Sequence, residues 1–189
     1  MQSILPFDEM NNFALKLSGM FPEGKLPPAQ EAKQEEEDII DEMLDLFLLA
    51  YATGNNITNA NLSFGWEPPI SEVMETVDKE VAGKTWRQRV EDYFANGGTG
   101  DDLIRIVETE VHRIANTAAL DTAIRAGATK KTWHCMMLPT SRDTHVYLDG
   151  MTIPINDEFY SFKGDSTQFP GQWGIAEEDV NCMCWLSFE

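Results

Sequence analysis

The chain of 189 residues is long enough to bury a substantial apolar core in one domain or in two small ones. Hydrophobic residues make up 42% and charged residues 24%, ordinary globular proportions that exclude wholesale disorder. The formal net charge of -18 is shared by both halves, with 18 acidic and 7 basic residues in 1–100 and 14 acidic and 7 basic in 101–189, so nonspecific binding of nucleic acid by the whole surface is disfavoured.

The start of the chain has Asp8 and Glu9 where a secretory signal would need a cationic region. No apolar run reaches membrane-spanning length. We therefore expect synthesis and assembly in the cytoplasm, with no membrane contact.

Residues 7–18 have helical apolar spacing, and residues 19–30 form a linker that Gly24 and three prolines keep from being helical throughout. The first helix is therefore predicted to be separable. It either docks onto a neighbouring protein or folds back on its own core. In the docking hypothesis, Met1 to Ser18 is dispensable for folding but needed for assembly.

Further helices follow in the middle of the chain. The acidic run at Glu35 opens a helix that is predicted to extend to about Thr53, with a loop from Gly54 to Asn61. The other predicted helices are 71–81 after Pro68 and Pro69, a helix after Gly83 that stops at 96–98, and a long helix from Asp101 or Asp102 to about Gly127.

The long helix carries one apolar stripe and a polar face on which we expect solvated side chains and pairs such as Glu108 with His112. A catalytic role for Glu108 or Glu110 is not favoured, because carboxylates on exposed helix faces are usually only solvated. The polar face comprises Arg105, Glu108, Glu110, Arg113, Asn116 and Asp121.

Short apolar or alternating runs after Gly127 predict strands at 132–138, 151–155, 158–162 and 182–188, with Pro154 on an edge strand. The predicted fold class is α+β: an N-terminal helical arm and a helix bundle, followed by a small C-terminal antiparallel β-sheet packed on the long helix. The expected divisions are 1–30, 31–127 and 128–189, with one compact core joining the last two parts.

His145, Cys182 and Cys184 are the candidate metal ligands, because alternation along a strand would place both cysteines on one face. Asp149, Cys135 or His134 is a possible fourth ligand. A Cys-x-Cys alone is not specific for zinc, so the favoured expectation is buried reduced thiols without a cofactor. Zinc and a strained disulfide bridge remain the alternatives.

The loop around His145 lacks a recognisable nucleophile motif, so we expect no catalytic residue. The alternative to a general base is a hydrogen-bonded His145 that ties this loop to the last strand. Arg142 is then expected to pair with an acidic residue, Asp143 or Asp149 to cap a turn, and Asn181 to satisfy loop backbone groups.

The order of these motifs resembles the phage Mu F-like minor head proteins over roughly residues 84–189. Two departures are Met183, where the family pattern has Arg between the cysteines, and LeuProThrSer at 138–141, where it often has an Asp. The residues that carry the resemblance are Glu108, Glu110, Asn116, Arg142, Asp143, His145, Asp149, Gly150, Pro170, Gly171, Asn181, Cys182 and Cys184.

The resemblance implies a structural, non-enzymatic minor head protein of a tailed bacteriophage, present in the virion inside the capsid or at the portal vertex. It would act in head assembly near the portal, with DNA packaging or ejection as a further role. The implied partners are portal, major capsid or scaffolding proteins and, indirectly, the packaged DNA, with no small-molecule substrate. Similar domains also occur fused to toxin or enzyme modules, so a hydrolase or nuclease, or a zinc-binding adaptor, is the alternative.

Overall fold

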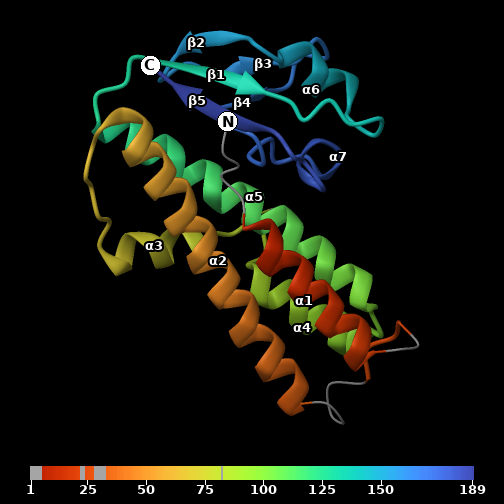
Figure 1. Ribbon diagram of the computed structural model, residues 1–189. Coiled ribbons are helices and arrows are strands. Elements are labelled where there is room, and N and C mark those ends of the chain that lie inside the picture. The colour runs from red at the N-terminus through yellow and green to blue at the C-terminus, as the bar shows by residue number, and fades with distance from the viewer. Residues whose placement is uncertain (1–5, 22–23, 28–32, 82) are drawn as a thin grey trace.

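The computed structural model describes residues 6–21, 24–27, 33–81 and 83–189. Five helices form the first part of the chain, and short strands with two small helices form the last part (Figure 1). The elements are α1 (Phe7–Met20), α2 (Lys33–Leu62), α3 (Ile70–Val77), α4 (Trp86–Asn96), α5 (Gly100–Arg125), β1 (Lys130–His134), α6 (Asp143–Leu148), β2 (Thr152–Pro154), β3 (Phe159–Tyr160), β4 (Ser166–Thr167), α7 (Ala176–Asp179) and β5 (Trp185–Phe188).

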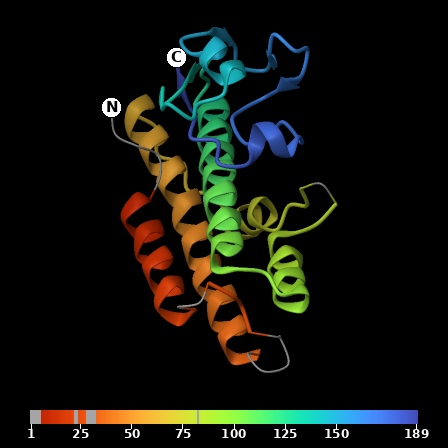
Figure 2. The same ribbon diagram turned by 90° about the vertical axis from the view of Figure 1, so that its right-hand side faces the viewer.

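Helix α5 is the central element, and α1, α2, α3, α4 and β5 all contact it. Figure 2 shows α5 between α2 on one side and α3 and α4 on the other, with the strands above its C-terminal half. A capping box at Thr99 and Asp102 fixes where α5 begins, since each residue hydrogen-bonds the backbone N–H of the other. No helix of the described residues is long and apolar enough to cross a membrane.

The antiparallel sheet has the strand order β2-β1-β5, and β3 and β4 form a separate hairpin. The predicted α+β class is confirmed, and Pro154 lies on the edge strand β2 as expected. The strands are shorter than predicted. In particular, Cys182 and Cys184 precede β5 instead of lying on it.

Helix α1 folds back on the chain's own core. Met10, Phe13 and Leu17 are buried in the first apolar cluster together with residues of α2, α4 and α5. The following segment is also fixed, because Leu26 N–H donates to the Gly98 carbonyl over 3.0 Å. Of the two alternatives for this helix, the structure shows the folded-back one, and these contacts count against the prediction that the helix is dispensable for folding. Pro22, Pro28 and the other linker residues at 22–23 and 28–30 lie outside the described ranges.

Helix α2 continues through the predicted loop and ends at Leu62. Gly54 is kept helical by tertiary packing, because it lies directly against the backbone of Ala115 on α5. Asn55 Nδ2 donates to Thr122 Oγ1 over 2.8 Å, and Asn59 Nδ2 donates to the Trp66 carbonyl over 2.8 Å. Contacts between helices thus override the local breaker signal. The predicted helix over 71–81 instead ends at Val77.

Two apolar clusters replace the single core that the sequence predicted. The first lies among α1 to α5, and the second lies between the C-terminal end of α5 and the strands. Ala118 belongs to the first and Ala123 to the second, so α5 is shared by both.

Candidate metal-binding site and its supporting network

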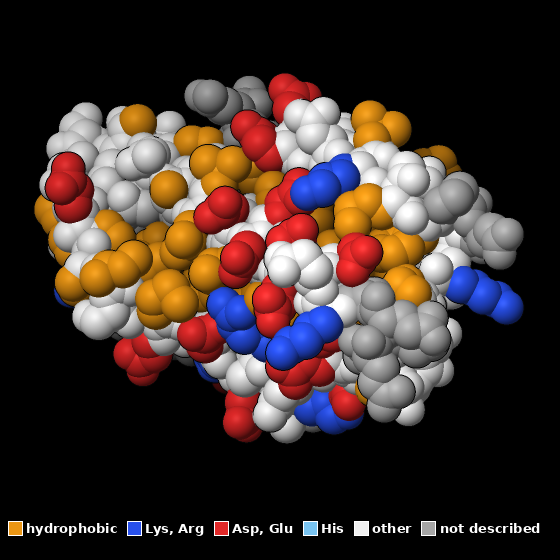
Figure 3. Space-filling model, turned by 90° about the horizontal axis from the view of Figure 1, so that it is seen from below, with side chains coloured by type: hydrophobic (Ala, Val, Ile, Leu, Met, Phe, Trp, Pro, Cys, Tyr) orange, Lys and Arg blue, Asp and Glu red, His pale blue; other side chains and the backbone are white. Residues whose placement is uncertain are grey.

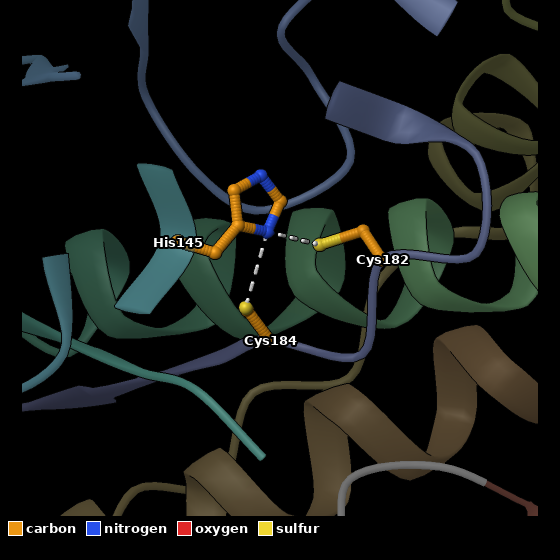
Figure 4. A group of neighbouring side chains, drawn as sticks. All are labelled: His145, Cys182 and Cys184. Carbon is orange, nitrogen blue, oxygen red and sulfur yellow. Dashed lines mark hydrogen bonds between the residues drawn. The ribbon is translucent and has the colours of Figure 1, made fainter. Parts of the chain in front are cut away.

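Helix α6 and the loop before β5 bring His145, Cys182 and Cys184 together. His145 Nδ1 lies 3.5 Å from Cys182 Sγ and 3.4 Å from Cys184 Sγ, and the three side chains point toward one another in Figure 4. None of the three residues is more than 3% exposed. Both cysteines are free thiols. The sequence predicted the grouping for the wrong reason, since a loop, and not strand alternation, places the two sulfurs.

Two tryptophans and a carboxylate surround the His145 ring. The Trp173 ring stacks on it at a centroid distance of 5.8 Å, and Trp133 meets it edge-on at 5.6 Å. On the other side of the imidazole, Nε2 lies 3.2 Å from Glu178 Oε2. The expectation that His145 links its loop to the segment of the last strand agrees with these contacts.

The Glu178 carboxylate is buried but well supplied with partners. Thr144 Oγ1 donates to it over 2.7 Å and Lys163 Nζ over 3.3 Å. Burial acts to raise the pKa of Glu178, but the hydrogen bonds from Thr144 and Lys163 and the nearby His145 outweigh it, so this pKa is below its ordinary value. Glu178 is therefore an anion that faces the imidazole.

The two thiols share one hydrogen-bonding arrangement with His145. The hydrogen bond from Cys184 lowers the pKa of Cys182 well below its usual value, with His145 acting in the same direction. The same bond and burial raise the pKa of Cys184. The sulfur of Cys182 is thus the hydrogen-bond acceptor, and the thiol of Cys184 is the donor.

Helix α5 supports the site from below. Asn116 Nδ2 donates to the Cys184 carbonyl over 3.2 Å and to the His112 carbonyl over 3.0 Å, which joins the helix to the Cys-x-Cys segment. His112 is buried, and its two ring nitrogens have no hydrogen-bond partner among the described residues, so the predicted pair with Glu108 is wrong. Burial lowers the pKa of His112 to about 4, with Cys182 acting in the opposite direction.

A buried ionic network lies about one turn before Asn116 on α5, where the sequence predicted a solvated face. Arg113 Nε donates to Glu110 Oε2 over 2.8 Å, and Arg113 Nη2 donates to the Thr76 carbonyl over 3.0 Å. Arg89 pairs with the other oxygen of Glu110. Gly171 packs on the Arg113 backbone, where a side chain would come within 3.2 Å of the Arg113 Cα. The Pro-Gly motif is therefore a close-packing point on α5, and the polar residues at this point hold helices together.

The remaining predicted residues fix turns. Asp149 Oδ1 accepts a hydrogen bond from the Cys135 N–H over 2.8 Å, and the Gly150 N–H donates to the Trp133 carbonyl over 2.8 Å. Arg142 donates to the Val180 carbonyl, a backbone group, and forms no ion pair among the described residues, so the predicted acidic partner is wrong. Asn181 is exposed and has a left-handed backbone, with φ of 56°.

Glu178, Asp179, Trp133 and Trp173 belong to this site but were not predicted. Asp179 accepts hydrogen bonds from the backbone N–H groups of Trp173 and Gly174, both over 2.8 Å, and so shapes the loop that carries Trp173. The run Glu177 to Asp179 has the composition of a solvated helix turn. Only its position three residues before Cys182 could have pointed to the site.

Comparisons with known proteins support the resemblance. Residues 71–187 match the family model described as "Phage Mu protein F like protein", a range that also includes most of α3. One relative is the "Minor head protein GP7" of Bacillus phage SPP1, 30% identical over 83 residues, which are 42% of this chain and 27% of that protein. Another is an "NAD(+)--arginine ADP-ribosyltransferase EFV" of Enterococcus faecalis, 34% identical over 85 residues, which are 43% of this chain and 17% of that protein.

The matches therefore span less than a third of the length of each of these two relatives. No solved structure matches the chain significantly.

Proposed function

The chain belongs to the family of phage Mu protein F like proteins, and on that premise we propose that it is a structural minor head protein of a tailed bacteriophage. The observation that carries the proposal is the extent of the family match. It runs from α3 to β5 and so includes the Glu110 network, the His145 cluster and the loop that packs on Arg113. The relative named as a minor head protein supports the same conclusion.

The finer role that we propose is assembly of the head near the portal, with a further role in packaging or ejecting DNA. The partners are then portal, major capsid or scaffolding proteins, and the protein is located in the virion. Contact with DNA is indirect, because the net charge of -18 repels phosphate. On the face seen in Figure 3, acidic side chains are spread widely, and most of the basic ones lie beside them.

The buried polar residues support a structural role over an enzymatic one. Glu110 pairs with Arg113 and with Arg89, and Arg113 also donates to the Thr76 carbonyl. Neither side chain is therefore free to bind a substrate. A surface hollow of about 790 Å³ beside α3 and α5 includes Glu72, Glu75, Asp78 and Asp121 among its lining residues. Such a lining disfavours phosphate-bearing ligands.

An enzymatic function is the second candidate, and the relative named as an ADP-ribosyltransferase is the observation that favours it. The match leaves most of that protein unaligned, which is consistent with a shared module joined to a separate effector part. An assay with labelled NAD(+) and arginine-containing acceptor protein tests this directly. We expect label incorporation at the level of a control without protein, and incorporation above it would contradict the non-enzymatic proposal.

The head-protein proposal is tested in the particle encoded by the same genome. Quantitative mass spectrometry of purified particles should detect the chain in few copies, and cryo-electron microscopy should locate it at the portal vertex or the inner capsid wall. Deleting its gene should lower the yield of infectious particles, and the gene supplied in trans should restore it. Particles that lack the chain and form normally without it would contradict the proposal.

A further inference from the structure

The arrangement of His145, Cys182 and Cys184 has the dimensions of a tetrahedral zinc site. Their ligand atoms all lie within 4.8 Å of one another. Zinc is bound at about 2.3 Å by sulfur and about 2.0–2.1 Å by imidazole nitrogen, so tetrahedral angles place nitrogen and sulfur about 3.5 Å apart. The two N···S distances of 3.5 and 3.4 Å agree with that value. A single ion can therefore lie at bonding distance from Nδ1 and from each sulfur in turn, and all three donors fall within the span of one site.

The chemistry of the three donors narrows the choice of ion. Two thiolates and one imidazole suit Zn²⁺, whereas Mg²⁺ and Ca²⁺ prefer oxygen ligands. All three groups are buried, so an ion here is shielded from bulk water. Zinc binds the thiolate form of cysteine, so binding releases the proton of any ligand that is still a thiol.

The surroundings of His145 include the carboxylate that often accompanies a metal-bound histidine. Such a histidine almost always donates its second ring N–H to a carboxylate, a carbonyl or water. Here Glu178 Oε2 lies 3.2 Å from Nε2, within ion-pair distance although Nε2 has no hydrogen-bond partner among the described residues, and Thr144 donates to the same oxygen. With the proton on Nε2, Nδ1 carries a lone pair and lies 3.5 and 3.4 Å from the two sulfurs. Trp173 and Trp133 fix the plane of the ring.

A small cavity of about 30 Å³ lies beside two of the three ligands, because His145 and Cys184 line it together with Cys135. Its size suits one water molecule. Of the three side chains considered as a fourth ligand, His134 is hydrogen-bonded to Ser187, and Asp149 holds the Cys135 N–H. Cys135 lines the cavity, but it is not in the described group whose ligand atoms lie within 4.8 Å of one another.

We propose that His145 Nδ1 and the sulfurs of Cys182 and Cys184 bind one Zn²⁺ ion, whose fourth position faces this cavity and holds water. The ion joins α6 to the segment before β5 and so fixes the end of the chain on α5. This replaces the expectation of metal-free thiols that the sequence favoured. It does not depend on the proposed function in the phage head.

The first test is elemental analysis of the purified full chain after incubation of the reduced protein with zinc and gel filtration. About one zinc per chain is expected. Cobalt(II) added to metal-depleted protein should give the intense thiolate-to-cobalt absorption band that reports sulfur ligands, and zinc should abolish it. The absence of both bound zinc and the cobalt band in reduced protein would overturn the proposal, as would a quantitative disulfide between Cys182 and Cys184 in protein purified without oxidant.

Variants assign the ligands. His145→Ala and Cys184→Ser should each lower zinc occupancy at least about tenfold, and Cys135→Ala is the matched control, a buried cysteine outside the group that should keep one zinc per chain. Chelation should lower the melting temperature of the wild-type protein by about 5 °C or more, but leave the His145→Ala variant unchanged. If Cys135→Ala also loses zinc, the assignment of an open fourth position is wrong. The cobalt spectrum of the wild type keeps the test decisive if a ligand variant does not fold.

Discussion

Lys131 is a lysine on the central strand β1 whose side chain is 0% exposed. Its ammonium nitrogen has no hydrogen-bond partner among the described residues and lies 5.5 Å from the centre of the Phe159 ring. Burial lowers the Lys131 pKa to about 8, with Asp157 and Glu158 acting in the opposite direction. The folded state therefore binds the Lys131 proton less tightly than the unfolded state does.

This pKa predicts how stability depends on pH. Between pH 8 and 10.5 the unfolded chain keeps the Lys131 proton while the folded chain loses it, so this group makes the free energy of unfolding rise with pH. Below pH 8 Lys131 is charged in both states, so the free-energy cost of burying its charge fully lowers the stability of the folded state. Lys131→Met should therefore stabilise the protein at pH 7 by about 1 to 3 kcal/mol, measured by urea unfolding.

The neighbouring lysine is the control for that measurement. Lys130 is exposed on the same strand, so Lys130→Met should change the free energy of unfolding by less than about 0.5 kcal/mol at any pH. Equal effects of the two substitutions, or an unchanged pH profile in Lys131→Met, would contradict a buried charge at position 131.

At the scale of single residues, the order of the motifs predicted which side chains come together, but it did not predict the buried polar contacts around them. His145, Cys182 and Cys184 were identified from their types and spacing, and the structure brings them together. Glu110 and Arg113 looked solvated because the helix period marks only one apolar stripe, and a buried ion pair has the same sequence pattern as an exposed one. Their burial depends on α3 and α4, which no local pattern encodes.

At the scale of elements, Gly54 shows how one helix contact overrides a local signal. A Cβ at Gly54 would lie 2.3 Å from the Ala115 carbonyl oxygen, so α2 and α5 approach too closely for any side chain there. The sequence predicted a helix end at this glycine. The role of Gly54 at the crossing of α2 and α5 could not be predicted, because the residue that it contacts, Ala115, lies 61 residues further along the chain.

Gly54→Ala should therefore destabilise the protein although alanine favours helices. Separating α2 from α5 should cost about 1 to 3 kcal/mol in the free energy of unfolding. Gly19→Ala is the matched control, since Gly19 lies in α1 with nothing within 4 Å of the added methyl group, and it should stabilise by about 0.5 to 1 kcal/mol. A stabilised Gly54→Ala variant in chemical denaturation would show that the two helices are not in close contact.

Helix α1 provides the second prediction at this scale. Leu17 is 1% exposed and Leu15 is 72% exposed, so the same substitution on one helix tests whether the helix is docked. Leu17→Ala should lower the free energy of unfolding by about 2 to 5 kcal/mol, and Leu15→Ala by less than about 0.5 kcal/mol. Both values come from guanidinium titration. Similar small effects for the two variants would restore the hypothesis of a separable arm.

At the scale of the whole molecule, the two apolar clusters are joined by one continuous helix. Asn116 of α5 binds the Cys184 carbonyl, and Gly171 packs on Arg113, so the C-terminal segments rest on the helix that also completes the first cluster. The α+β class was predictable from the change in periodicity after Gly127. The division into two clusters was not, because periodicity shows that a face is buried but not which neighbours cover it.

We therefore expect the two clusters to unfold together. In native-state hydrogen exchange, the slowest amides of α2 and of β1 should open with the same free energy, equal within error to that of global unfolding. Leu17→Ala in the first cluster should lower protection in β1 as much as in α2. Strand amides that open at a distinctly lower free energy and do not respond to Leu17→Ala would show that the C-terminal part is an independent folding unit.

The central position of α5 also determines the order in which the chain can fold. Helix α1 ends at Met20, and its partner α5 begins only at Gly100, so their contact requires closure of a long loop. Contacts this distant in sequence slow folding relative to a bundle of sequence neighbours, despite the high helix content. During synthesis, the parts of α1 and α2 that pack on α5 stay uncovered until α5 has left the ribosome. In that interval the nascent chain is most exposed to aggregation.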